Sequence, residues 1–270
     1  MSSLRATTTP VPQSTGAALE VRCMGGFSVH LGGVPVRRWH AGKARSLFQY
    51  LLVNRGRVVL RDTLYEVLWP DQEWSPGSSS LKVAAHALRR MLLESGAPAR
   101  IEHQDFGYVL RADDLWVDAE ELQASFSAGR VAELRGDHEG ATAHYRRVAA
   151  LHQGDYLAGE TADWVHEQRE WYRSLALRAL TYLRGQALAR EDFPEVIEWS
   201  RQALAIDRYQ EETYQALMIA HGRLGELDRV RSWHELCVRR LGEELNLEPT
   251  AETTRILAHA MQGRLRSSAA

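Results

Sequence analysis

The stretch Ser78–Leu93, SSSLKVAAHALRRMLL, decides how the first part of the chain folds. Its apolar residues recur with the i, i+4, i+7, i+11 spacing that places side chains on one face of a helix. These residues are Leu81, Ala85, Leu88 and Leu92. The opposite face is polar and basic, and it consists of Ser79, Lys82, His86, Arg89 and Arg90. The serines supply an N-cap and Gly96 with Pro98 ends the helix, so we expect one buried face and one exposed basic face.

A helix of this kind fits the major groove of DNA, because short polar side chains can reach base edges while arginines reach phosphates. The alternative is an ordinary surface helix whose basic face is solvated. The helix taken alone favours this alternative, and the sequence around it reverses the choice.

The residues before this helix predict a small sheet and two further helices. Apolar and polar residues alternate in short pieces over residues 19–31, which predicts strands. The turn signal Gly32-Gly33 then precedes a returning strand at residues 34–36. Apolar residues at helical spacing predict a first helix over residues 44–52. After an extended piece at residues 58–60, Asp62 is expected to cap a second short helix, which ends at Trp69-Pro70.

The residues after the basic helix, Arg100 to Leu110, predict two strands around a tight turn. The resulting order is sheet, three helices and hairpin, with the basic helix third. This order is typical of a winged helix-turn-helix, whose third helix enters the major groove and whose hairpin touches the DNA backbone or minor groove. The hairpin offers Arg100, His103 and Gln104 as further DNA contacts.

A family resemblance supports this interpretation. Lys43–Leu52, Arg61–Asp71, Ser80–Leu92 and Gly107–Leu110 resemble, in turn, the first helix, second helix, recognition helix and wing of transcriptional activators of the Streptomyces antibiotic regulatory protein type. The resemblance implies a winged helix of the response-regulator type and binding to direct repeats near a promoter. Residues 84–87, where many relatives carry bulkier or more basic side chains, depart from the pattern. The expected DNA-binding residues are Ser79, Ser80, Lys82, His86, Arg89, Arg90, Arg100, His103 and Gln104.

The second part of the chain contains three similar segments, residues 136–151, 191–207 and 225–241. The second and third are offset by 34 residues, an offset that Trp199 and Trp233 share. A helix–turn–helix period of 34 residues is that of tetratricopeptide repeats, which stack into a curved array. We therefore expect a mainly α protein, in which a winged helix with small β-sheets precedes an all-α repeat domain.

Two further stretches extend the resemblance. Residues 154–171, an insertion between the first two repeats, and residues 241–253 resemble signatures of the bacterial transcriptional activation domain that follows the winged helix in the same family. The resemblance then covers residues 19–260. The expected organisation is a disordered leader at 1–17, a winged-helix domain at 18–113, the activation domain at 114–262 and a disordered tail at 263–270.

The net charge of −2 hides an asymmetry between these parts. Residues 1–113 hold 14 Lys and Arg against 9 Asp and Glu, a net of +5, and the remaining 19 against 26 leave −7 in residues 114–270. The basic part can approach phosphate, whereas the acidic part would repel it and suits a protein partner.

Several functional classes find no support in the sequence. Cys23 and Cys237 lie too far apart for a zinc motif, and the histidines lack metal-ligand spacing, so no metal site is expected. No phosphate loop, nucleophile motif or acid/base pair is evident, so neither a cofactor nor catalysis is expected. Because the chain lacks a membrane-spanning run and a secretory signal, we expect a cytoplasmic protein.

Tryptophans mark two further candidate sites. In the repeat domain, Trp164, Trp171, Trp199 and Trp233 either pack in the core or line a pocket for a small-molecule effector. In the loop before the basic helix, Trp74 with Asp71 and Glu73 either contacts RNA polymerase, as in related winged helices, or folds back on its own domain.

These observations predict a transcriptional activator that binds double-stranded promoter DNA, pairs head to tail as a homodimer on direct repeats, and recruits RNA polymerase. Two alternatives remain from the sequence alone. One is a sensor whose repeat domain binds an effector that switches DNA binding. The other is a repeat-based scaffold whose winged helix contacts protein.

Overall fold

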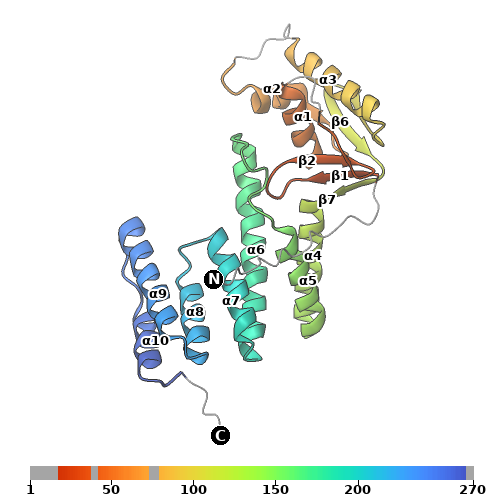
Figure 1. The fold of residues 1–270 in the computed structure, drawn as a ribbon. Helices are drawn as coiled ribbons and strands as arrows, with labels where there is room; N and C mark the ends of the chain where they lie inside the picture. Colours follow the sequence, from red (N-terminus) through yellow and green to blue (C-terminus); the bar gives the residue numbers. More distant parts are fainter. Residues whose placement is uncertain (1–17, 38–41, 73–78, 266–270) are drawn as a thin grey trace. The chain divides into compact units, whose positions relative to one another are not determined.

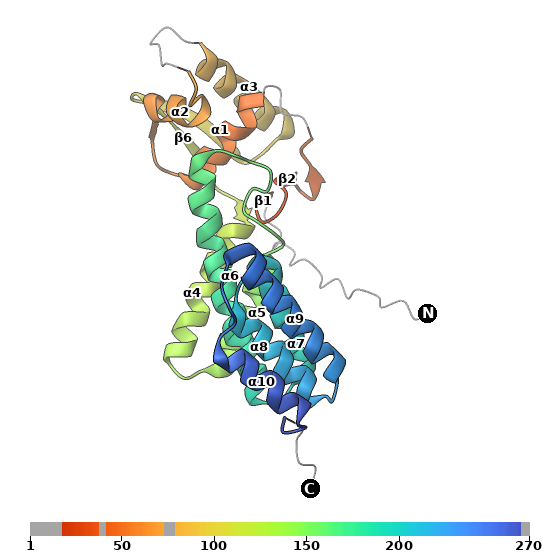
Figure 2. The same ribbon diagram turned by 90° about the vertical axis from the view of Figure 1, so that its left-hand side faces the viewer.

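The computed structural model describes residues 18–37, 42–72 and 79–265 (Figures 1 and 2). The chain divides into two compact units, the first reaching Glu121 and including Gln153–Glu170, the second made of Leu122–His152 and the residues from Trp171 onward. The leader expected at residues 1–17 and most of the expected tail lie outside the described residues. The fold class predicted from the sequence, a winged helix with small sheets followed by helical repeats, is confirmed.

A four-stranded sheet opens the first unit. The strands β1 (Leu19–Arg22), β2 (Ser28–Leu31) and β3 (Val34–Pro35) are antiparallel, as the turn signal at Gly32-Gly33 predicts. A strand that the sequence did not indicate, β7 (Leu115–Val117), pairs with β1 in parallel and completes the order β3-β2-β1-β7. The alternation along β1 buries Leu19 and Val21, which face the core.

Three helices follow, α1 (Gly42–Val53), α2 (Arg61–Leu68) and α3 (Ser80–Ser95) (Figure 1). The apolar faces predicted for them are buried, with Leu47, Leu64 and Leu88 fully enclosed. Gly96 ends α3, as the sequence predicted, and it adopts the left-handed conformation, φ 69°.

The predicted N-cap of α2 was wrong, whereas that of α3 is confirmed in its position. Helix α2 begins at Arg61, so Asp62 lies within its first turn, and the N-cap position belongs to Leu60 because the preceding residues are held in a strand. Ser79 occupies the N-cap position of α3, but its side chain makes no capping hydrogen bond.

The wing is a three-stranded sheet of order β4-β6-β5, comprising β4 (Val59–Leu60), β5 (Ala99–Gln104) and β6 (Gly107–Ala112). The predicted hairpin is confirmed by the antiparallel register from Ala99↔Ala112 to Gln104↔Gly107. The short extended piece before α2 also joins this sheet, through Val59↔Tyr108.

Helices make up the rest of the described chain: α4 (Asp118–Leu134), α5 (His138–Leu151), α6 (Asp163–Ala189), α7 (Phe193–Ile206), α8 (Glu211–Arg223), α9 (Leu227–Arg239), a π-helix η1 (Arg240–Glu244) and α10 (Ala251–Met261). The three predicted repeat segments begin at α5, α7 and α9. Helices α7 to α10 lie side by side (Figures 1 and 2). Equivalent acidic residues precede the three repeat helices, and the side chains of Asp137 and Asp192 each accept a hydrogen bond from the backbone N–H three residues on.

Residues 153–170 belong to the first unit although they lie between two repeats in the sequence. Their backbone pairs with the residues that follow β1, because the Leu157 N–H donates to the Cys23 carbonyl at 2.7 Å and the Ala158 N–H to the Gly25 carbonyl at 2.8 Å. The carboxylate of Glu160 also contacts α1. It accepts a hydrogen bond from the Gln49 side chain at 3.2 Å and forms an ion pair with Arg45 at 3.3 Å. The insertion recognised in the sequence therefore completes the first unit.

Candidate nucleic-acid interface

The exposed face of α3 is the centre of the candidate interface. The buried face carries Leu81, Ala84, Ala85, Ala87, Leu88, Met91 and Leu92. All six predicted contact residues of the helix, Ser79, Ser80, Lys82, His86, Arg89 and Arg90, are exposed. The structure thus separates an apolar side that packs on α1 and the wing from a polar side that reaches solvent.

The two arginines of this face differ in their surroundings. The Arg89 Nε–H donates to the backbone carbonyl of Ile101 at 3.0 Å, and its guanidinium lies 5.7 Å from the centroid of the Tyr108 ring. Arg90 instead forms an ion pair with Glu94 one turn later, at 2.6 Å, where both side chains are about half exposed. Arg89 is therefore tied to the wing, whereas Arg90 stays on its own helix.

The wing residues are engaged with one another. Arg100 pairs with Glu102 at 2.7 Å, and Glu102 also lies 3.7 Å from Arg111. The hydrogen bond from Arg100 holds the pKa of Glu102 below its usual range, so this carboxylate stays ionised. The wing strands and turn carry two arginines and two acidic residues, which leaves them without net charge and concentrates the positive charge on α3.

His103 and Gln104 are both exposed near the end of β5. A guanidinium nitrogen of Arg61 lies 2.7 Å from His103 Nε2, and the His103 ring meets Tyr108 edge-on. Sequence reasoning missed Phe106, which stands in the turn after Gln104 and is 78% exposed. A large apolar residue beside Asp105 in a tight turn was the signal that could have found it.

The predicted polymerase-contact loop is described only in part. Asp71 is exposed just after α2, whereas Glu73 and Trp74 lie outside the described residues.

The four tryptophans of the candidate effector pocket have different surroundings. Trp164, in the first unit, meets the Tyr50 ring edge-on with 5.2 Å between centroids. Trp171 is 48% exposed in the second unit. Trp199 packs against a cluster around Val196 and Ala216, and Trp233 against two others around Met218 and Tyr214. The equivalent positions of Trp199 and Trp233 in the repeats thus correspond to packing against neighbouring helices.

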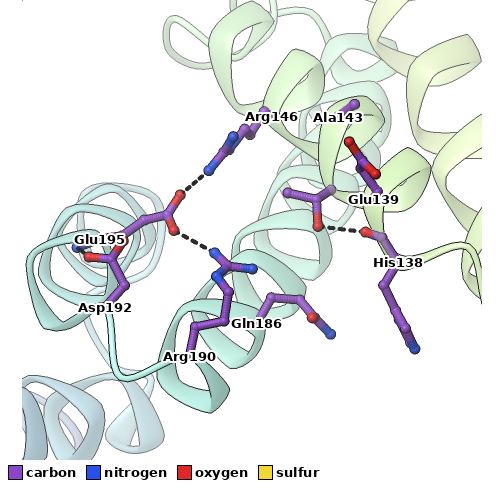
Figure 3. Close-up of a pocket in the computed structure, with 9 residues that line it drawn as sticks. His138, Glu139, Ala143, Arg146, Gln186, Arg190, Asp192 and Glu195 are labelled. Atoms are coloured by element: carbon purple, nitrogen blue, oxygen red, sulfur yellow. Dashed lines mark hydrogen bonds and ion pairs between the residues drawn. The ribbon is translucent and has the colours of Figure 1, made fainter.

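A polar pocket of about 560 Å³ lies in the second unit between α5, the end of α6 and the start of α7 (Figure 3). The guanidiniums of Arg146 and Arg190 both point at the carboxylate of Glu195, and Arg190 reaches it at 2.7 Å. None of the four candidate tryptophans lines this pocket. The pocket contains an ion triad of Arg146, Arg190 and Glu195, which joins α5 and α7 to the residue that follows α6.

The described residues contain neither a cluster that could hold a metal ion nor a helix that could span a membrane. Within residues 18–37, 42–72 and 79–265, no group of three His, Cys, Asp or Glu side chains is arranged to hold a metal ion. The helices of the same ranges include none that is long and apolar enough to cross a membrane.

A winged helix with an exposed basic third helix, followed by helical repeats, defines a class of transcriptional regulators. Two family models match the chain in this order: the C-terminal domain of transcriptional regulatory proteins over residues 40–110, and the bacterial transcriptional activator domain over residues 117–260. The chain belongs to the bacterial transcriptional activator domain family, and it is a regulator of the Streptomyces antibiotic regulatory protein type.

A relative with a similar sequence agrees with this assignment. The chain is 27% identical over 250 residues to the transcriptional regulator RedD of Streptomyces coelicolor, a match that covers 87% of this chain and 68% of RedD. Its fold is similar to that of EmbR of Mycobacterium tuberculosis, solved in complex with a low-affinity phosphopeptide. The TM-score is 0.70 at 18% identity, over 93% of this chain and 66% of the EmbR chain. At this identity the likeness concerns the fold alone.

Proposed function

We propose that this regulator activates transcription by binding direct repeats in promoter DNA through α3 and by recruiting RNA polymerase. The observation that carries the proposal is the face of α3 on which Lys82, His86 and Arg90 are exposed together, opposite a buried apolar face. Short side chains at Ser79 and Ser80 open the helix, so its N-terminal half is suited to base edges.

The remaining predicted contacts have distinct roles in this proposal. Arg89 supports the helix against the wing while its charge still adds to the basic face. Arg100, His103 and Gln104 approach the sugar–phosphate backbone from the wing, and the exposed Asp71 marks the loop that faces the polymerase. Two copies bind in the same orientation, head to tail, on adjacent repeats in the cytoplasm.

The test is binding to DNA from upstream of the protein's own gene, measured by fluorescence anisotropy over a salt series. Lys82→Ala should weaken binding to all sequences and lower the slope of log K against log salt by about one, because one phosphate contact is lost. His86→Ala should instead change the preferred sequence. Arg231→Ala is the matched control, because Arg231 is a half-exposed arginine of α9 in the acidic part of the chain. Absence of binding by the unaltered protein at low salt would contradict the proposal.

Activation is tested separately, by in vitro transcription with RNA polymerase on the bound promoter. Asp71→Lys should leave DNA binding intact and lower transcript yield. A change in DNA affinity in either direction would assign Asp71 to the DNA interface.

A further inference from the structure

The first unit carries an apolar projection and, elsewhere on its surface, an apolar recess. The projection is Phe106 at the tip of the wing, 78% exposed. The recess is a pocket of about 460 Å³ between the β2–β3 hairpin and the C-terminal end of α3. Its apolar lining is made by Leu31, Val34, Pro35, Val36 and Met91.

Phe106 cannot fill the recess of its own chain. The recess includes Glu94 and Ser95 at the end of α3, close to where β5 begins, whereas Phe106 follows the far end of β5. A strand of six residues at roughly 3.3 Å per residue separates the two features by about 20 Å. Only a second molecule can bring them together.

We propose that Phe106 of one copy inserts into this recess of a second copy bound at the adjacent DNA repeat. The inference rests on the proposed function, because two copies in the same orientation must meet through two different surfaces. A projection on one surface and a recess on another are the two halves of such a head-to-tail contact.

The charges favour a protein partner over DNA for the wing tip. Asp105, next to Phe106, would repel phosphate, whereas Arg37 lies at the recess and offers it a partner of opposite charge. The other charge at the recess, Glu94, is already paired with Arg90 at 2.6 Å. The insertion of Phe106 therefore also places Asp105 of one copy near Arg37 of the next.

The size of the contact predicts when it forms. One aromatic side chain buries about 150–250 Å², far less than the roughly 1,200 Å² of a stable interface. This contact alone should therefore not hold two copies together at micromolar concentration in solution. On DNA with two repeats, each bound copy raises the effective concentration of the other, so the same contact forms. It is then measured as cooperative binding to the two repeats.

The experiment compares DNA carrying both repeats, as mapped by footprinting of the unaltered protein, with DNA in which one repeat is scrambled. Phe106→Ala should reduce cooperativity on the double site by roughly tenfold and leave single-site affinity unchanged. Val34→Glu should do the same, because it places a charge at the recess. Leu134→Ala, at a second-unit residue that is also 78% exposed, is the control and should change neither quantity.

Charge exchange provides the second test. Asp105→Arg and Arg37→Asp should each lower cooperativity, and the double variant should recover it. A Phe106→Ala variant that loses single-site affinity would overturn the proposal and assign the tip to DNA. Non-cooperative binding by the unaltered protein would also overturn it while leaving the proposed function intact, and absence of any binding would overturn both.

Discussion

The Nε–H of Arg89 donates a hydrogen bond to the backbone carbonyl of Ile101 at 3.0 Å. This bond joins the exposed face of α3 to the first strand of the wing. The same guanidinium lies over the ring of Tyr108 on the second strand, 5.7 Å from its centroid. One side chain therefore fixes α3 to both strands of the hairpin. Arg89, which the sequence predicted to contact DNA, therefore also fixes the position of α3 against the wing.

Alanine at the two neighbouring arginines should separate structural from DNA-binding effects. Arg89→Ala should lower the free energy of unfolding by about 1–2 kcal/mol, because the Ile101 carbonyl and the Tyr108 ring lose a charged partner. Arg90→Ala should change it by less than about 0.5 kcal/mol, because its ion pair with Glu94 is exposed. Both should weaken DNA binding. Urea unfolding of the two variants checks the prediction, which fails if their stabilities are equal.

A glycine at the start of β6 should be intolerant of substitution. A Cβ atom added at Gly107 would lie 2.3 Å from the backbone carbonyl oxygen of Val59, closer than any real contact. Gly107→Ala should therefore push β4 away from β6 and cost about 1–3 kcal/mol, as overpacking does. Gly33→Ala in the β2–β3 turn is a control for backbone strain alone, because its added Cβ meets nothing within 4 Å. Thermal unfolding should show a larger fall in Tm for Gly107→Ala, and equal falls would contradict the steric argument.

The sequence predicted the elements whose residues recur at a regular spacing. The spacing of Leu81, Ala85, Leu88 and Leu92 was enough to identify α3 and its buried face, and the 34-residue offset placed the repeats. Strands of two or three residues are too short to show a period. The pairing of β4 with β6 and of β7 with β1 therefore could not be predicted from the sequence.

Contacts between residues distant in the sequence were equally out of reach. The carbonyl that accepts from Arg89 and the docking of residues 153–170 onto the end of β1 depend on the tertiary fold. For the candidate site, the sequence identified which side chains of α3 are exposed. It did not show that Arg100 is paired by Glu102 or that Phe106 forms the tip.

Asp118 should show an inverse dependence of stability on pH. It is 5% exposed, and its carboxylate accepts backbone hydrogen bonds from Cys23 at 2.7 Å, Met24 at 2.9 Å and Ala119 at 2.8 Å. Burial raises its pKa above the usual range although these N–H groups lower it. Asp118→Asn should cost about 1–3 kcal/mol, because an amide NH₂ replaces one acceptor.

The sign of the pH effect follows from the raised pKa. The folded protein holds the Asp118 proton more tightly than the unfolded chain, whose pKa is about 3.9, so the unaltered protein loses stability as pH rises through the folded pKa. The difference in the free energy of unfolding between the unaltered protein and Asp118→Asn should therefore narrow as pH rises from about 4 to about 7, as measured by urea unfolding. Asp114→Asn, which removes an exposed acceptor of the Ala18 N–H, is the control. A gap that widens with pH would contradict the assignment.

Glu195 should show the opposite pH dependence. Burial alone would raise its pKa, but the hydrogen bond and charge of Arg146, with a further hydrogen bond from Arg190, lower the pKa below the usual range (Figure 3). Its stabilising effect is therefore present above the unfolded pKa of about 4.3 and is lost as pH falls through the folded value. Glu195→Gln should cost about 1 kcal/mol at pH 7, a modest amount because both guanidiniums are half exposed.

The difference in unfolding free energy between the unaltered protein and Glu195→Gln should narrow as pH falls below about 4.5. The difference for Asp118→Asn should instead widen as pH falls from about 7 to about 4 and then level off. Urea unfolding of both variants from about pH 7 to about pH 3 tests the two signs in one experiment. Glu139→Gln, at an exposed α5 residue that lines the same pocket, serves as the control and should stay close to the unaltered protein. If Glu195→Gln matched the control at every pH, the triad with Arg146 and Arg190 would not stabilise the junction of α5, α6 and α7.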